Sequence, residues 1–438
     1  MIRLSGQGAF DIVAQVIPSF RIDPPREARL ATFRALGGEV IDRGLYLVFP
    51  GPRSETGEDM VELHSHGGLV VPVQLLAMLE AAGARPAHPG EFTRRALMNG
   101  KLDLLQAEAL ADLVDAEAPA QARIAVNQLE GGLSRRIAEL RESLIGLLAL
   151  LAYEVDFPEE DDGPLPRERL EGERAKVAAQ VAALLATAPL AERVRSGALV
   201  VLAGPPNAGK SSLFNALLGR ERALVTELPG TTRDAIEAMV DFCGWPIRLV
   251  DTAGIGESTD RLDQMGREVS RRYVAAADLV IACEEGARRE ARGEGTAGAA
   301  RGARGGGVAL TDRLPPSAIL PVATKSDLHT PPAGSLAVSV VTGEGLDQLR
   351  QEVARRLFNA GVALADLGPA LTRVRHREAL AGADAALRAA HPHFATGGDA
   401  VLAAHEVQEA VRALDTLIGS VDIEEVLDRL FAGFCVGK

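Results

Sequence analysis

The segment GPPNAGKS, residues 204–211, constrains the fold of this 438-residue chain more than any other feature. It matches the pattern GxxxxGK[ST], in which glycines let successive backbone N–H groups face phosphate oxygens. A β-branched run, 198–203, precedes it, and the helical pattern SSLFNALLG follows from Ser211. This strand–loop–helix order is the context that a phosphate-binding loop requires, so a chance glycine-rich turn is the weaker interpretation. The segment therefore predicts a nucleotide site beside a parallel sheet.

Four further motifs follow in the order of a Ras-like GTPase domain. LPGTTRD, 228–234, suits a loop that closes over the γ-phosphate and its metal ion, and Asp251 of DTAG is placed to hold Mg²⁺ through water. Asp327 of TKSD is placed to accept hydrogen bonds from N1 and the exocyclic amino group of guanine, which adenine cannot donate. VSVVTGEG, 338–345, offers a turn over the base. Five elements in this order predict a GTP-binding domain.

Hydrophobic periodicity divides the chain into three domains, one of them discontinuous. Short apolar runs separated by Gly and Pro predict a small α+β domain over residues 1–98. Helical spacing of apolar residues predicts a helical domain over 99–194 that resumes over 359–438. The inserted domain, 195–358, alternates strands and helices, which predicts a mostly parallel sheet and a multidomain α/β fold. Its predicted strands are 198–203, 247–251, 279–283, 319–324 and 336–339.

Composition limits the partners and the environment. With 47 Lys plus Arg against 60 Asp plus Glu, the net charge is −13, so strong non-specific nucleic-acid binding is not expected and any RNA contact must be local. Cys243, Cys283 and Cys435 lie far apart, which predicts neither a disulfide framework nor a metal knuckle and fits the reducing cytoplasm. We expect no membrane insertion, because no apolar run reaches the roughly 20 residues that span a bilayer. The Gly/Arg/Ala-rich stretch 284–307 is interpreted as a surface linker rather than an RNA contact.

Four segments resemble the tRNA uridine modification GTPase family called MnmE or TrmE. They are TGEDMVELHSHGG (56–68), RPAHPGEFTRRALMNGKLDLLQAEALADLVDA (85–116), GPPNAGKSSLFNALLGRERALVTELPGTTRD (204–234) and the terminal FCVGK (434–438). The resemblance implies a K⁺-dependent GTPase that, with a flavin-containing partner of the GidA/MnmG type, modifies C5 of the wobble uridine of certain tRNAs by carboxymethylaminomethyl-type chemistry. It implies a one-carbon unit from tetrahydrofolate, as the 5,10-methylene or 5-formyl derivative. An N-terminal domain that binds this folate and forms a homodimer, within a heterotetramer, is implied as well.

The resemblance also assigns the nucleotide site residue by residue. Potassium would add positive charge next to the phosphates, as an arginine finger does in other GTPases. The family's K⁺ ligands match Asn207, Thr226, Leu228 and Thr231, and its Mg²⁺ ligands match Ser211 and Thr232. The predicted GTP contacts are Asn207, Ala208, Gly209, Lys210, Ser211, Ser212, Thr226, Glu227, Leu228, Pro229, Gly230, Thr231, Thr232, Asp251, Thr252, Ala253, Gly254, Thr324, Lys325, Ser326, Asp327, Ser339, Val340 and Val341.

Folate binding and the tRNA chemistry are assigned in the same way. The family's folate-binding positions match Arg3, Glu62, Lys101 and Lys438. A carboxylate such as Glu62 can accept two hydrogen bonds from the amidine-like face of a pterin, and cations suit the glutamate tail. Without the resemblance, Glu62 and Lys101 would be interpreted as surface ion-pair partners. Cys435 matches the tail cysteine proposed to act as nucleophile or acid/base, and simple packing is the alternative.

Three features depart from the family's pattern. The chain opens close to IRLSG, before which relatives carry about one more strand and a turn; we expect either a start assigned too late or a shortened folate domain. Thr324 stands where the family has Asn, so that guanine selection is expected to depend on Asp327. Asp263 stands at the position of the catalytic glutamate that orients the attacking water, and its side chain is one methylene shorter.

Two other classes of function share parts of this pattern. A ribosome-assembly or other regulatory GTPase would contain the same nucleotide domain, but such proteins normally add an RNA-binding module, which an acidic helical domain does not resemble. A P-loop kinase would need a lid and a phosphoryl acceptor site, and it would not need both DTAG and TKSD. The pattern favours the tRNA modification GTPase over both.

Asp263 provides the first test. We expect Asp263→Glu to raise K⁺-stimulated GTP turnover, because the longer side chain brings the carboxylate closer to the attacking water. The measurement is phosphate release at saturating GTP in K⁺. An unchanged rate would show that residue 263 does not limit hydrolysis.

Overall fold

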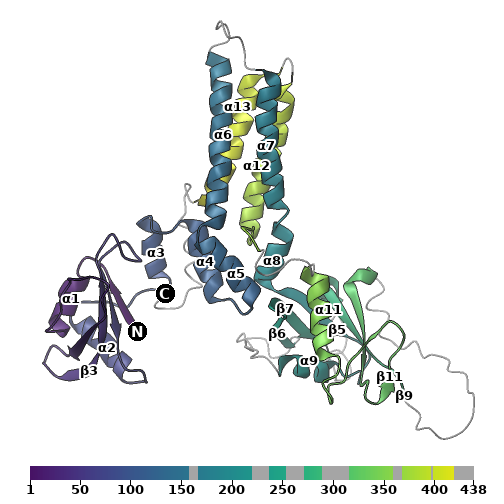
Figure 1. Ribbon diagram of the computed structural model, residues 1–438, viewed down its shortest axis with the longest axis horizontal. Helices are drawn as coiled ribbons and strands as arrows, with labels where there is room; N and C mark the ends of the chain where they lie inside the picture. Colours follow the sequence, from purple (N-terminus) through teal and green to yellow (C-terminus); the bar gives the residue numbers. More distant parts are fainter. Residues whose placement is uncertain are drawn as a thin grey trace, which may run out of the picture. The chain divides into compact units, whose positions relative to one another are not determined.

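The structure is a computed structural model that describes residues 1–156, 166–219, 236–252, 271–288, 315–358, 367–395 and 398–418. The chain forms two compact units. The first comprises residues 1–111, 128–182 and 378–438, and the second comprises 112–127 and 183–377. In Figure 1 the helices and strands are coloured in the order of the chain.

The N-terminal part of the first unit is a four-stranded antiparallel sheet with helices packed on it. The sheet order is β1-β4-β3-β2, in which β1 and β2 are the edges. Apolar residues of the first two helices, among them Val13 and Leu75, join Phe33, Tyr46 and Leu63 of the sheet in one core. The elements are β1 (Ile2–Ser5), α1 (Ala9–Val16), β2 (Arg29–Arg34), β3 (Val40–Phe49), β4 (Met60–His64), α2 (Val71–Ala81) and α3 (Glu91–Met98).

Helices make up most of the other described residues of the first unit (Figure 1). They are α4 (Leu104–Val114), which continues into the second unit, α6 (Gly132–Asp156), α7 (Arg167–Leu185), α12 (Val374–Ala390), the short η5 (His391–Phe394) and α13 (Ala400–Ile418). Helices α6 and α13 pack along each other, and Arg141 pairs with Asp415 between them at 2.7 Å. The buried Arg174 of α7 donates to the carbonyl of Leu387 in α12 at 3.1 Å. Segments far apart in the sequence therefore form one bundle.

The second unit is built on a six-stranded sheet of order β12-β10-β8-β5-β7-β6. All neighbouring strands are parallel except β6 and β7, so the predicted mostly parallel sheet is confirmed. The predicted strands at 198–203 and 319–324 have the observed bounds. Its strands are β5 (Ala198–Ala203), β6 (Ile236–Phe242), β7 (Trp245–Asp251), β8 (Leu279–Glu285), β10 (Ile319–Thr324) and β12 (Leu336–Ala337).

Helices cover the sheet, and a small ribbon extends it. The helices are α5 (Pro119–Leu129), α8 (Ala188–Ser196), α9 (Lys210–Leu218), α11 (Leu346–Phe358) and the short η3 (Pro316–Ala318). Trp245 stacks on Phe358 with ring centroids 4.6 Å apart, which ties β7 to α11. Strands β9 (Ala287–Arg288) and β11 (His329–Thr330) pair antiparallel. The predicted linker at 284–307 is therefore wrong at its start, where β8 pairs with β10 and β9 pairs with β11, and residues 289–307 lie outside the described residues.

By length and composition alone, the helical stretch 167–196 is apolar enough to cross a membrane. A third of its most apolar window is buried inside the protein, and core helices pass the same test. A single such stretch is weak evidence for a membrane span.

Candidate functional site

The phosphate loop connects β5 to α9 through a close approach of backbone. Gly204 follows β5 with φ +154°, and a Cβ on it would lie 2.3 Å from the carbonyl oxygen of Cys283 in β8. Gly209 adopts the left-handed conformation at the start of α9, and Asn207 also has positive φ, at 63°. Lys210, the first residue of α9, donates from Nζ to the carbonyls of Gly204 and Pro205 at 3.1 and 2.9 Å. The loop thus has the nest-like shape that phosphate binding requires.

The candidate magnesium residues lie at the carboxyl ends of neighbouring strands. Asp251 ends β7 opposite Leu202 of β5 in the parallel register, and its side chain is buried. Thr252 donates to the carbonyl of Leu202 at 2.8 Å, which fixes the chain after β7. Ser211 is exposed in the first turn of α9. The predicted residues Thr226 to Thr232, Ala253, Gly254 and Asp263 lie outside the described residues.

The candidate base-binding loop follows β10 and contacts the phosphate loop. Thr324 Oγ1 donates to the carbonyl of Ala208 at 2.8 Å, and Lys325 Nζ donates to that of Asn207 at 3.0 Å. Asp327 Oδ1 accepts a hydrogen bond from Ser339 Oγ at 2.7 Å. The remaining predicted contacts on this side are Ser326, which is buried, and Val340 and Val341, which are exposed. The structure brings TKSD, VSVVTGEG and the phosphate loop together.

The predicted folate residues in the N-terminal part lie on adjacent strands and a nearby loop. Arg3 of β1 faces Glu62 of β4, and its guanidinium pairs with Glu62 and Glu55 at 2.9 Å each. Lys101 Nζ donates to the carbonyl of Pro52 at 3.0 Å. Glu62 and Lys101 line one open cavity of about 480 Å³, within the usual range for small-molecule sites. Lys438 and Cys435 lie outside the described residues, so neither is placed at this cavity.

Comparison with known proteins identifies the family. The family model described as the MnmE helical domain matches residues 104–435, and that described as the GTP-binding protein TrmE N-terminus matches residues 1–101. The chain belongs to the MnmE family. This confirms the resemblance seen in the sequence.

The relatives match along the whole chain. A protein of Acidiphilium cryptum named tRNA modification GTPase MnmE is 41% identical over 451 residues, which cover 100% of this chain and 95% of the relative. The protein of that name from Thermus thermophilus is 43% identical over 449 residues, with the same coverage. Among solved structures, the G domain of the T. maritima iron transporter FeoB covers 36% of this chain and 98% of its own, at 24% identity and a TM-score of 0.27. That score is too low to support an argument.

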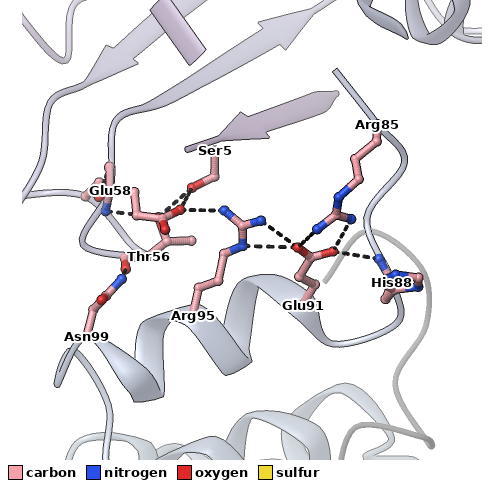
Figure 2. Close-up of polar contacts among 9 residues, drawn as sticks. Ser5, Thr56, Glu58, Arg85, His88, Glu91, Arg95 and Asn99 are labelled. Carbon is pink, nitrogen blue, oxygen red and sulfur yellow. Dashed lines mark hydrogen bonds and ion pairs between the residues drawn. The ribbon is translucent and has the colours of Figure 1, made fainter. Parts of the chain in front are cut away.

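A charged network holds the N-terminal part of this MnmE-family chain around α3 (Figure 2). Glu91, near the start of α3, accepts hydrogen bonds from Arg85, from Arg95 one turn later, and from the backbone N–H of His88. Arg95 also reaches Glu58, in the loop between β3 and β4, at 2.7 Å. The network therefore ties α3 to the loop that carries Glu55 beside the candidate folate cavity.

The same loop has two further attachments in Figure 2. Ser5 of β1 hydrogen-bonds Thr56 at 2.7 Å and donates to Glu58 at 3.2 Å. Asn99, the residue after α3, donates to the carbonyl of Thr56 at 2.7 Å. The sequence analysis missed these residues as a functional group. Arg85, Glu91 and Arg95 all lie in the quoted segment 85–116, but Glu58, the second partner of Arg95, lies in the separate segment 56–68.

Electrostatics makes Glu91 the centre of this network. Hydrogen bonds from Arg85, then the His88 N–H and Arg95, lower the pKa of its carboxyl to about 2 from the usual 4.5, against an opposing effect of burial. A carboxyl with a lowered pKa stabilises the fold above the unfolded-state pKa, and this stability is lost as pH falls toward the folded-state pKa. The stabilisation is thus complete above about pH 5 and disappears between pH 4.5 and 2.

We expect Glu91→Gln to destabilise the chain by about 1–2 kcal/mol at pH 7, after allowance for the solvent exposure of Arg85 and Arg95. The difference in unfolding free energy between wild type and variant should shrink as the pH falls from 5 to 2. Urea denaturation followed by circular dichroism at several pH values measures it. The exposed Glu39→Gln, in the same sheet region, is the control and should show no such pH dependence. A difference that stays constant across this range would contradict the role of the Glu91 charge.

Proposed function

We propose that this chain is a K⁺-dependent GTPase that acts with a flavoprotein partner in the C5 modification of the wobble uridine of certain tRNAs. The carrying observation is that a phosphate loop, a buried Asp251 and a base-binding loop are assembled in one unit of a chain related over its full length to tRNA modification GTPases. The folate one-carbon donor, the carboxymethylaminomethyl product, the GidA/MnmG-type partner and a homodimer through the N-terminal part belong to the same proposal. So does a cytoplasmic location.

GTP hydrolysis would use charges at the end of the sheet. Lys210 already donates to loop carbonyls and is positioned to turn its ammonium to the β- and γ-phosphates. Ser211 and Thr232 would hold Mg²⁺, with Asp251 acting through water; hydroxyl and carboxylate oxygens are the donor types that this ion takes. A bound Mg²⁺ neutralises developing charge on the phosphates. Asp263 would orient the attacking water.

Potassium would be held by Asn207, Thr226, Leu228 and Thr231, and it would add positive charge next to the phosphates. Asn207 fits this role in one respect: its side chain is exposed on the loop while its carbonyl is held by Lys325. An exposed side chain on a backbone that is held in place can offer its amide oxygen as a ligand. Oxygen ligands of this kind suit a hard cation.

Folate would bind at the cavity lined by Glu62 and Lys101. Both oxygens of Glu62 are engaged, one by Arg3 and the other by the half-exposed His64 at 3.3 Å. An amidine-like ring edge could take the place of His64 while Arg3 stays paired with the carboxylate. Lys101 and Lys438 would bind the anionic tail, and Cys435 would act in the tRNA chemistry as nucleophile or acid/base.

Analysis of the wobble uridine in cellular tRNA tests the proposal directly. In cells that lack the gene, we expect the C5-modified wobble nucleoside to disappear from tRNA hydrolysates analysed by mass spectrometry. The wild-type gene should restore it, and Lys210→Ala should not, because the phosphates lose their main cation. The exposed Lys176→Ala is the matched control and should restore it fully. An unchanged nucleoside profile in the deletion strain would overturn the proposal and favour a ribosome-assembly GTPase.

Nucleotide turnover by the purified chain tests the chemistry without tRNA. We expect phosphate release to be faster with GTP than with ATP by at least two orders of magnitude, because adenine lacks the N1–H and 2-amino donors of guanine that would bind Asp327. With GTP, K⁺ should give faster release than Na⁺ at equal ionic strength. Preference for ATP would indicate a kinase-like enzyme, and equal rates in K⁺ and Na⁺ would remove the potassium part of the proposal.

A further inference from the structure

The carboxylates at the candidate folate cavity already have a counter-charge. Glu55 and Glu62 both line the cavity, and the guanidinium of Arg3 pairs with each of them at 2.9 Å. One arginine therefore serves two carboxylates, and it has little capacity left for an anionic group of a ligand. A ligand that carries carboxylates must find its counter-charge elsewhere in the cavity.

Two further arginines line the same cavity without an acidic partner. Arg26 and Arg53 are exposed, and neither forms an ion pair with a residue in the described part of the chain. Lys101, also at this cavity, donates to a carbonyl rather than to an acid. Cations that border a cavity without a neighbouring acid attract anionic ligand groups. We call these three residues, Arg26, Arg53 and Lys101, the cationic rim.

Hydrogen bonds to two consecutive carbonyls join the members of the cationic rim. Lys101 Nζ donates to the carbonyl of Pro52 at 3.0 Å, and Arg26 Nη2 donates to that of Arg53. Arg26 has a φ of 64°, in the left-handed region that residues other than glycine seldom adopt. Its N–H donates to the carbonyl of Val48 in β3 at 2.9 Å. A strained conformation of this kind persists only where its surroundings hold it, and it is frequent at ligand sites.

The remaining lining of the cavity includes an apolar pair. Phe49 of β3 lies opposite Met60 of β4 in the antiparallel register, and both residues line the cavity. Glu62 follows Met60 by two positions in β4, so the two side chains share one face of the sheet. The cavity thus combines an acceptor carboxylate, an apolar surface and cations without acidic partners. A folate has the matching parts, which are a donor-bearing ring, an aromatic spacer and an anionic tail.

We propose that the cationic rim selects folates by the length of their tail: Arg26 and Arg53 bind the added carboxylates of a γ-linked polyglutamate. The one-carbon donor of this chain is then a polyglutamylated tetrahydrofolate rather than the monoglutamate. The inference rests on the proposed folate binding at this cavity. Each further γ-linked glutamate adds one carboxylate, and a guanidinium binds a carboxylate through two parallel hydrogen bonds. Lys101 is left to the first glutamate.

Two ligands that differ only in the tail test this selection without turnover. They are 5-formyltetrahydrofolate with one glutamate and the same compound with three. The wild-type chain should bind the triglutamate about ten-fold more tightly, because two added carboxylates meet two arginines. This preference should shrink as NaCl rises from about 50 to about 300 mM, since salt screens exposed charges. Calorimetric titration of the full-length chain measures both Kd values.

Variants of the two arginines assign the preference to the cationic rim. Arg53→Ala should lower the ratio of the two Kd values to about three-fold, and Arg53→Lys, which keeps the charge, should retain more of it. Arg26→Gly removes the guanidinium while glycine suits the positive φ, so the loop keeps its path. Arg26→Gly and Arg53→Ala together should abolish the preference. Arg43→Ala, at an exposed arginine of β3 outside the cavity, is the matched control and should leave both Kd values unchanged.

The possible outcomes separate tail selection from other roles. Equal affinity of the wild-type chain for the two ligands would overturn the proposal. So would a double variant that keeps the preference, or variants that weaken both ligands by the same factor, since that pattern indicates support of the loop rather than contact with the tail. Failure of the wild-type chain to bind either ligand would instead refute the folate part of the proposed function.

Discussion

The contact between Gly204 and the main chain of β8 is the constraint on which the nucleotide site depends. No side chain fits between this residue and the Cys283 carbonyl, so the phosphate loop leaves β5 directly against its neighbour in the sheet. Strand β5 lies between β7 and β8, and β10 follows β8. The phosphate loop therefore begins at the same edge of the sheet at which β7 ends with Asp251 and the base-binding loop begins. Residues more than 100 positions apart in the sequence meet at this edge.

Side-chain donors hold the carbonyls of the phosphate loop from several sides. Lys210 holds two of them from within the loop, and Thr324 and Lys325 hold two more from the base-binding loop. Carbonyls that are bound in this way are kept from turning their negative ends toward an anion. The shape of the loop is thus set before a phosphate arrives, and less free energy is spent on ordering it when one binds.

The parallel part of the GTPase sheet could be predicted because each of its strands is a short apolar run beside a motif. Strand β6 could not, because it joins β7 through a tight turn at Cys243 and Gly244, both with positive φ. Asn-Gly or Asp-Gly is the usual signal for such a turn, and Cys-Gly is not. The start of β7 was also missed in the prediction, because Pro246 lies in this strand and proline argues against a strand.

The phosphate and base residues were predictable because fixed spacing within each motif encodes them. The network around Glu91 was not, since it depends on Arg95 meeting Glu58 across 37 positions. The path of the β3–β4 loop and the placement of α3 decide which residues of the two segments come into contact. No local pattern contains this information.

The pairing of Arg141 with Asp415 joins positions 274 residues apart, and almost the whole GTPase unit lies between them in the sequence. During synthesis the ribosome releases α6 and α7 long before α12 and α13. Leu140 and Leu144 of α6 are fully buried in the finished bundle. The apolar faces of α6 and α7 therefore stay exposed until α12 and α13 have been synthesised. The inserted sheet can meanwhile complete its own core. The bundle is thus the final part to close, and a truncated nascent chain would present a folded nucleotide unit beside two unpaired, aggregation-prone helices.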